Sequence, residues 1–241
     1  MGILQEIFIK GSTTEFSNYR PISLLTSFSK IIEKIIYKTL YHHLQEHNIL
    51  VNEQFGFREK LSTDLATHAL LNTVLISLDK KKYLVGGLFC DLQKAFNCVN
   101  HDTLLDKLEF YGISGIGIKL MRSYITKRYH RVALKDNVCN KLTSKWELVK
   151  HGVLQGSVLG PLLFLIYIND LPQILNSAAN PILFADDTSI IISNTDSQEF
   201  LNNITTVMND TIKWFQRNLL SMNYDKTHVS QFMGGGETKW K

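Results

Sequence analysis

Two adjacent carboxylates, Asp186 and Asp187, interrupt an otherwise apolar segment at 181–193. A tight turn would explain the pair by itself, because Asp side chains hydrogen-bond to nearby backbone groups. A third carboxylate, Asp91, ends another short apolar segment at 83–90. If the two segments form neighbouring strands of one sheet, the three carboxylates converge.

Three carboxylates in one place imply a bound cation. Like charges that lie close together raise one another's pKa and are unstable unless a cation lies among them. Oxygen-only ligands favour Mg²⁺ or Mn²⁺, and no His or Cys accompanies the doublet to favour zinc. Two such ions ~3.5–4 Å apart stabilise both the attacking and the leaving oxygen of a phosphoryl displacement. The pattern therefore predicts nucleotidyl transfer.

Basic residues gather between positions 119 and 150. They outnumber two acidic residues there, and Tyr124, Tyr129 and Trp146 lie among them. Such a segment is typical of a surface that binds a polyanion, and equally of a solvated helix and hairpin, so both interpretations stay open. The basic residues are Lys119, Arg122, Lys127, Arg128, Arg131, Lys135, Lys141, Lys145 and Lys150.

The composition is that of a globular protein. The chain has 241 residues, 44% of them hydrophobic, and a formal net charge of +4, so it can bury a core as one large domain or two smaller ones. The apolar stretch at 158–168 is shorter than the ~20 residues of a membrane span, so no membrane contact is expected. No secretory leader is recognised, and Cys90, Cys98 and Cys139 form no CxxC pair. We expect an intracellular protein of the cytoplasm or nucleus that is not secreted.

Hydrophobic periodicity predicts mixed helices and strands. A small antiparallel sheet packed on helices indicates the α+β class. Helices are expected at 29–47, 63–78, 158–169 and 197–219. Strands are expected at 83–90 and 223–233, in a pair with an acidic tip at 181–193, and in a hairpin of 131–136 and 141–150.

Local features refine these helices. Asp102 is expected to cap a further helix that stops at Gly112, and Pro172 is expected to end the helix at 158–169. The helix at 197–219 presents an apolar stripe made of Leu201, Ile204, Val207, Met208, Ile212 and Phe215. The helix at 29–47 presents a stripe that should face a core, made of Ile31, Ile32, Ile35, Ile36, Leu40 and Leu44.

Six blocks occur in an order that spacing alone does not explain. The chain resembles the reverse transcriptase of non-LTR retrotransposons, of the jockey-like kind, from about residue 10 to residue 233. The blocks are NYRPISLL at 18–25, QFGFR at 54–58, CDLQKAFN at 90–97, GVLQGSVLGPLLF at 152–164, FADD at 184–187 and NYDKT at 223–227.

The resemblance implies a right-hand polymerase that lacks its thumb. Residues 1–82 would be fingers-like and 83–241 palm-like, with the first palm strand and helices at 83–112, a basic helix and hairpin at 113–150 and the rest of the palm at 151–241. Such an enzyme copies an RNA template into DNA on a DNA primer, with dNTP substrates and two Mg²⁺ ions, for which Mn²⁺ is a substitute.

The resemblance also assigns catalytic roles. Asp91 and Asp186 would hold both metal ions, with Asp187 beside them and the carbonyl of Leu92 as a further ligand. Lys226 matches the lysine that protonates the pyrophosphate leaving group. Without the resemblance, Lys226 is an exposed loop charge.

Other matched positions would bind the nucleotide or the nucleic acid. Arg20 and Lys10 would hold the triphosphate, since a guanidinium donates to phosphate in a planar fork. Phe96 would exclude a 2′-hydroxyl by steric clash, although a core Phe is the plain alternative. The turn at Gln155 and Gly156 would support the incoming nucleotide and the template base. The residues expected to contact nucleic acid are Arg58, Lys127, Arg128 and Arg131.

Some features depart from the family. Asn97 and Asn100 stand where related elements carry Asp; neither is a metal ligand position, so we expect Asn to keep a cap or turn hydrogen bond. A thumb and an endonuclease are not recognised in the 241 residues, and other chains would have to supply them. The first hypothesis is therefore an RNA-directed DNA polymerase. The alternatives are a catalytically silent nucleic-acid-binding remnant and, ranked below both, another palm-type enzyme such as a nucleotidyl cyclase.

Overall fold

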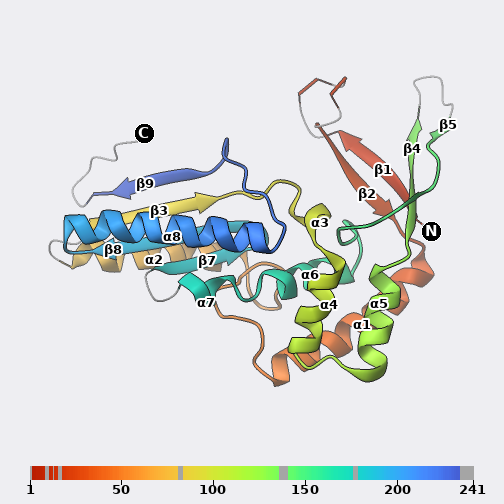
Figure 1. The fold of residues 1–241 in the computed structure, drawn as a ribbon, viewed down its shortest axis with the longest axis horizontal. Coiled ribbons are helices and arrows are strands. Elements are labelled where there is room, and N and C mark those ends of the chain that lie inside the picture. The colour runs from red at the N-terminus through yellow and green to blue at the C-terminus, as the bar shows by residue number, and fades with distance from the viewer. Residues whose placement is uncertain are drawn as a thin grey trace. The chain divides into compact units, whose positions relative to one another are not determined.

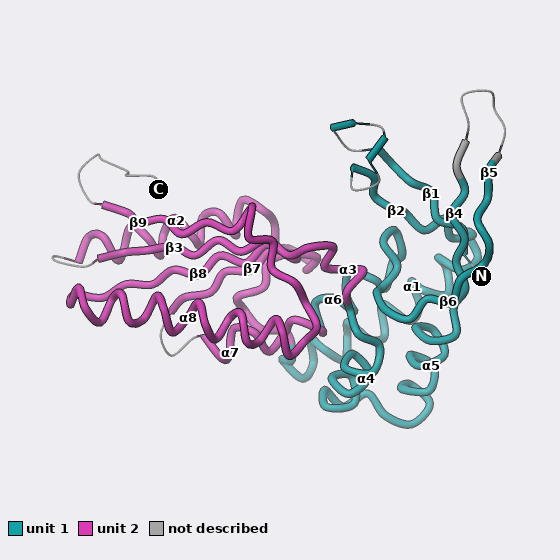
Figure 2. Tube along the Cα trace, turned by 45° about the horizontal axis from the view of Figure 1, so that its top comes forward, with its two compact units in different colours: residues 1–49, 99–166 teal, residues 50–98, 167–241 magenta. Residues whose placement is uncertain are grey.

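The chain folds into two units, which Figure 2 shows in different colours. Residues 1–49 and 99–166 form the first unit, and residues 50–98 and 167–241 form the second. The division into fingers-like and palm-like regions at 82 and 83 remains a prediction from the resemblance, and the compact units divide the chain elsewhere. Lys10 lies outside the residues that the computed structural model describes. These are 2–8, 11–12, 14–15, 18–80, 84–135, 141–175 and 179–233.

The second unit is built on a four-stranded antiparallel sheet (Figure 1). Its order is β7-β8-β3-β9, so the hairpin β7–β8 lies beside β3, as the convergence of the carboxylates requires. The predicted antiparallel sheet is confirmed. The strands are β7 (Asn180–Phe184), β8 (Asp187–Asn194), β3 (Leu84–Cys90) and β9 (His228–Phe232).

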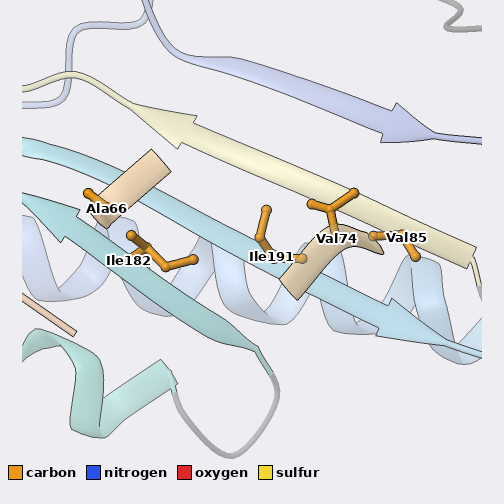
Figure 3. Close-up of a cluster of buried hydrophobic side chains, with 5 residues drawn as sticks. All are labelled: Ala66, Val74, Val85, Ile182 and Ile191. Atoms are coloured by element: carbon orange, nitrogen blue, oxygen red, sulfur yellow. The ribbon is translucent and has the colours of Figure 1, made fainter. Parts of the chain in front are cut away.

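Helices cover both faces of this sheet. Alternate residues of a strand point to opposite faces. Val85 of β3 shares a buried cluster with Ala66 and Val74 of α2 (Thr63–Asp79), as Figure 3 shows. A side chain on the next residue, Gly86, would instead meet Phe200 of α8 (Ser197–Arg217) at 3.0 Å. The sheet is therefore enclosed between α2 and α8.

The apolar stripe of α8 differs from the prediction. Leu201 is 54% exposed, whereas the preceding residue, Phe200, is buried. The prediction was wrong at this end, where Phe200 lies against β3, but two later members of the predicted stripe, Val207 and Phe215, are buried as expected. The adjacent positions 200 and 201 both fit an apolar helical period, and packing against β3 and β8 decides which of them is buried.

The first unit contains the second sheet. Its order is β2-β1-β4-β5, with β6 also paired to β4, and the pair β1–β4 is parallel. The predicted hairpin is present as β4 paired with β5 and β6, and residues 136–140 lie outside the described part of the chain. The strands are β1 (Gly2–Phe8), β2 (Tyr19–Leu24), β4 (Tyr129–Lys135), β5 (Lys141–Thr143) and β6 (Glu147–Leu148).

One of two predicted helix ends is wrong. The helix α4 (His101–Phe110) is capped by Asn100 and not by Asp102, because Asn100 has an extended backbone and its Oδ1 accepts a hydrogen bond from the Thr103 amide at 3.0 Å. The expected cap or turn role of Asn100 is thus confirmed. The helix expected at 158–169 does end before Pro172, at Ile168, and Pro172 lies in the first turn of a separate helix, α7 (Leu171–Leu175), where a missing amide hydrogen is tolerated.

The buried helix at 158–169 is confirmed as α6 (Leu159–Ile168). Two further helices are α1 (Ser27–Glu46) and α5 (Gly115–Ile125). The stripe of α1 faces a core only in its second half: Leu40 and Leu44 are buried, but Ile31 and Ile35 are 56% and 64% exposed. In the first half of α1, Glu33 is the buried side chain, so the apolar period alone misjudged this half.

Glu33 connects three segments of the first unit. One carboxylate oxygen accepts from the Tyr124 hydroxyl at 2.9 Å, and the other accepts from the Val158 amide at 2.7 Å. The Arg128 guanidinium stacks over the Tyr124 ring at 5.3 Å and donates to the Gly152 carbonyl at 3.3 Å. Burial, followed by the negative charge of Glu33, raises the pKa of Tyr124, so its hydroxyl keeps the donated proton.

We predict that Glu33→Ala lowers the free energy of unfolding by about 3 kcal/mol, because it leaves the Tyr124 hydroxyl and the Val158 amide without their acceptor. Denaturant unfolding measures this change. Glu46→Ala, an exposed carboxylate on the same helix, is the control and should change stability by less than about 0.5 kcal/mol. Equal stability of the two variants would contradict the structural role of Glu33.

Candidate active site

Asp91 and the acidic doublet lie at one end of the second unit's sheet. Cys90, the last residue of β3, pairs with Thr188 of β8, and Phe184 pairs with Asp187. Asp91 follows Cys90, and Asp187 precedes Thr188, so continuing the antiparallel register brings the two aspartates opposite each other. The condition on which the predicted convergence depended, that the two strands are neighbours, is met.

The first carboxylate of the doublet lies in the hairpin turn itself, and the second begins β8. Ala185 and Asp186 connect β7 to β8, and Ala185 has a φ of +56°, in the left-handed region. Asp186 is half-buried and Asp187 is exposed. The turn interpretation and the chemical one therefore describe the same residues, because the reversal carries the carboxylates to the end of the sheet.

The carboxylates act on one another electrostatically. The pKa of Asp187 is raised, first by partial burial and then by the negative charges of Asp186 and Asp91, while Lys226 opposes the shift. A carboxyl whose proton is favoured by its neighbours lies in an excess of negative charge. The site is thus one where a cation would be stabilised.

Asp91 is held by two groups from the segment before β9. The Lys226 ammonium lies 3.3 Å from its Oδ2 atom, and the Asn223 side-chain amide donates to the same oxygen at 3.0 Å. The Asn223 backbone amide donates to the Asp91 carbonyl at 2.8 Å. Lys226 is therefore an ion-pair partner of the site. Asn223 had no predicted role, although it opens the NYDKT block.

A short backbone pairing fixes this segment beside the end of β3. The Gln93 amide donates to the Ser221 carbonyl at 2.8 Å, and Leu92 forms an antiparallel bridge with Met222. The Leu92 side chain is buried. The segment that carries Asn223 and Lys226 is thus positioned by backbone contacts, and metal binding by the Leu92 carbonyl remains a prediction.

The side chains do not form a ready metal cage. Among the residues that the structure describes, no three His, Cys, Asp or Glu side chains are grouped so that they could hold an ion. The Oδ2 atom of Asp91 instead faces the Lys226 ammonium. The oxygen-only donors and the excess negative charge around Asp187 nevertheless fit a hard divalent cation in their chemistry.

Phe96 lies on the short helix α3 (Ala95–Cys98), next along the chain from Asp91. Its ring meets that of Phe57 edge-on, with centroids 6.1 Å apart. The Phe96 side chain is half-buried, and Phe57 is 47% exposed. Phe96 is therefore not a fully enclosed core residue, and its role toward the sugar remains a prediction.

Three predicted nucleotide-binding residues belong to the first unit. Arg20 is exposed on β2. The turn at Gln155 and Gly156 docks on the same strand, since the Ser23 amide donates to the Gln155 carbonyl at 2.9 Å. Gly156 has a φ of +96°, and a Cβ there would lie 3.0 Å from the Ile22 side chain. Glycine is thus required for both conformation and close approach.

The predicted nucleic-acid contacts differ in their surroundings. Arg58 donates to the Val51 carbonyl at 2.6 Å, within its own loop. Arg128 is half-buried against Tyr124, as described above. Arg131 stacks over the Trp146 ring at 4.7 Å, and Lys127 is exposed. Arg58 and Arg128 thus have structural contacts, and binding of nucleic acid by all four remains a prediction.

We predict that Asn223→Ala weakens Mn²⁺ binding about tenfold, as measured by electron paramagnetic resonance, because outer-shell hydrogen bonds orient ligating carboxylates. Asn209→Ala, an exposed asparagine on α8, should bind Mn²⁺ like the wild type. Equal affinity in all three proteins would remove Asn223 from the site.

We also predict that Asp187→Asn stabilises the metal-free protein at neutral pH, by about 0.5 kcal/mol for such exposed charges. The raised pKa means that the folded state holds the Asp187 proton more tightly than the unfolded state does. That stability is present below the ordinary value of 3.8 and is lost as the pH rises through the raised one. The gain should therefore vanish below about pH 4.

Chelator-treated protein unfolded by denaturant at several pH values provides the measurement. Asp106→Asn, at an exposed position on α4, is the control. A stability gain for Asp187→Asn that persisted unchanged at low pH would rule out charge repulsion as its cause.

Known proteins resemble this chain in sequence. One relative, described as "Probable RNA-directed DNA polymerase from transposon BS" of Drosophila melanogaster, is 33% identical over 222 residues, which cover 87% of this chain and 23% of the relative. The RNA-directed DNA polymerase from mobile element jockey of Drosophila funebris is 29% identical over 218 residues, which cover 88% of this chain and 23% of the relative. The chain thus spans about a quarter of the length of these relatives.

Solved structures resemble it in fold. Apo telomerase from Candida tropicalis, truncated from its C-terminal domain, matches with a TM-score of 0.63 at 14% identity, over 91% of this chain and 49% of that one. Telomerase from Candida albicans, in complex with a TWJ fragment of telomeric RNA, matches with a TM-score of 0.62 at 13% identity, over 99% of this chain and 42% of that one.

The family model for "Reverse transcriptase (RNA-dependent DNA polymerase)" matches residues 10–238, nearly the whole chain. No helix in the described part of the chain has the length and apolar character that a membrane span needs. With its antiparallel sheet, its acidic strand ends and its relatives among the polymerases of mobile elements, the chain belongs to the reverse transcriptase family.

Proposed function

We propose that this chain carries the polymerase activity of a non-LTR retrotransposon and extends a DNA primer along an RNA template. The observation that supports it most is the end of the second unit's sheet. There Asp91 follows β3 beside Asp186 and Asp187, and Lys226 is ion-paired with the first of them. The proposed place of this activity is the cytoplasm or the nucleus.

The residues proposed to hold two Mg²⁺ ions are Asp91, Asp186 and Asp187, with the Leu92 carbonyl as a further ligand and Mn²⁺ as a substitute ion. Such ions, when bound, stabilise charge on the attacking and leaving oxygens of phosphoryl transfer. The assignment is supported by the raised pKa of Asp187, to which the negative charges of Asp186 and Asp91 contribute after partial burial, and by the oxygen-only donors of the three side chains.

Lys226 is proposed to hold the proton that the leaving pyrophosphate takes up. A lysine ammonium carries a proton at neutral pH, and this one lies 3.3 Å from the Asp91 carboxylate. Asn223 would orient the same carboxylate through the bond to Oδ2. One short segment of the chain thus carries the proton donor, Lys226, and also the residue that orients the Asp91 carboxylate, Asn223.

The substrate contacts are proposed as follows. Arg20 would bind the dNTP triphosphate, and the Gln155–Gly156 turn, docked on the strand that carries Arg20, would support the nucleotide. Phe96 would discriminate against a 2′-hydroxyl. Lys127, which is exposed, is the most accessible candidate for contact with template and primer phosphates, because Arg58 and Arg128 are engaged by protein carbonyls and Arg131 is half-buried against Trp146.

A second candidate is a catalytically silent protein that binds nucleic acid. The observation that favours it is the ion pair in which the Lys226 ammonium lies 3.3 Å from Asp91 Oδ2, one of the oxygens proposed to bind metal. In this hypothesis the fold and the basic residues between 119 and 150 are kept, and primer extension is lost.

Primer extension on poly(rA)/oligo(dT) with Mg²⁺ and dTTP separates the two. We expect extension by the wild type and a loss of at least about 100-fold in Asp186→Ala, since a metal ligand is removed. Asp106→Asn should extend like the wild type. Binding of primer-template without extension, even with Mn²⁺ and at low salt, would favour the silent protein.

A further inference from the structure

The hairpin turn that carries Asp186 has a backbone that its own sequence disfavours. Ala185 has a φ of +56°, a left-handed conformation in which a Cβ is strained and which glycine adopts readily. A residue in such a conformation persists only where its surroundings determine it. The contacts around Ala185 therefore decide where the next two carboxylates lie.

Gln54 makes these contacts, although it lies 131 residues away in the sequence. Its side chain is buried, and its Oε1 atom accepts hydrogen bonds from the amide of Ala185 at 3.1 Å and from that of Gly56 at 2.7 Å. Its Nε2 atom donates to the Ala185 carbonyl at 3.4 Å. One side-chain amide thus binds both peptide groups of the left-handed residue.

The backbone around Gln54 brings it to the turn. The Leu183 amide donates to the Glu53 carbonyl, and the Phe55 amide donates to the Leu183 carbonyl, both at 2.8 Å. Residues 53–55 therefore extend the sheet at β7, its edge strand, as a one-residue parallel bridge. This pairing fixes the position from which the Gln54 side chain reaches Ala185.

Gly56 leaves room for the same contact. A Cβ on Gly56 would lie 2.2 Å from the Ala185 nitrogen, so any side chain would separate the two segments. On the other side of the loop, Arg58 donates to the Gln54 carbonyl at 3.3 Å. The alternating residues Gln54, Gly56 and Arg58 thus form a cradle for the turn.

We propose that Gln54 is a positioning residue for the polymerase chemistry: it holds Ala185 left-handed and thereby fixes Asp186 and Asp187 at the end of the sheet. The inference rests on the proposed function of those carboxylates. Gln54 touches no reacting group in this assignment and acts through the turn alone.

The test compares Gln54→Ala and Gln54→Met with the wild type. Methionine keeps the volume of glutamine and removes its hydrogen bonds. We expect kcat for dTTP incorporation to fall about tenfold or more while KM for dTTP changes less than twofold, and the Mg²⁺ concentration for half-maximal rate to rise severalfold. Gln216→Ala, an exposed glutamine on α8, should match the wild type.

Two measurements distinguish positioning from simple stability. Adding Ala185→Gly to Gln54→Ala should restore part of kcat, because glycine needs no support at positive φ. Amide hydrogen exchange should quicken at Ala185 in Gln54→Met, while amides in the middle of β8 keep their protection. Variants that unfold more easily but keep the wild-type kcat and Mg²⁺ response would overturn the inference.

Failure of the proposed function gives a different result. If the wild type does not extend a primer, the polymerase assignment falls. The position of the carboxylates can then still be tested without polymerase activity. Terbium binding, measured by luminescence, and amide exchange at Ala185 are compared between the wild type and Gln54→Met. Wild-type extension together with unchanged Gln54 variants would instead leave the polymerase assignment intact and remove Gln54 from it.

Discussion

Repulsion among three carboxylates is the constraint on which the second unit depends. Asp91, Asp186 and Asp187 lie at the ends of two neighbouring strands, and partial burial, followed by the negative charges of Asp186 and Asp91, raises the pKa of Asp187. Without fixed backbones, the repulsion between these carboxylates would move them apart. Here the paired strands hold their backbones, and the Lys226 ammonium compensates part of the charge at Asp91. The same repulsion that opposes folding makes the site favourable for a divalent cation.

Segments distant in the sequence supply the supports for these carboxylates. Asn223 binds the Asp91 side chain from 132 residues away, and Gln54 binds the turn at Ala185 from 131 residues away. Each uses a neutral side-chain amide, which donates or accepts without adding charge to an already acidic site. Both amides lie on or next to short segments that pair with neighbouring backbone: Gln54 forms a bridge with Leu183, and Met222, which precedes Asn223, forms a bridge with Leu92. This pairing positions the two amides. Neutral supports around charged ligands are what a metal-dependent site needs in its outer shell.

In the first unit, a buried carboxylate, Glu33, connects the segments around a proposed nucleotide-binding turn. Glu33 accepts hydrogen bonds from Tyr124 and from the amide of Val158, which follows the Gln155–Gly156 turn. That turn in turn accepts a hydrogen bond from Ser23 on β2, the strand that carries Arg20. The Gln155–Gly156 turn, which is proposed to bind the nucleotide, is therefore attached by hydrogen bonds to β2 through Ser23 and, through Val158, to Glu33 of α1.

The sequence by itself determined the fold class, the antiparallel sheet with its acidic strand ends, the buried helix α6 and the family. These follow from local apolar periods and from ordered motifs, which need no knowledge of distant contacts. Tertiary structure alone decided that Asn100 and not Asp102 caps α4, that Ile31 and Ile35 are exposed, and that Asn223 and Gln54 hold the site. The physical reason is that a periodic stripe or a polar side chain has several compatible environments. Only packing against segments far along the chain selects one of them.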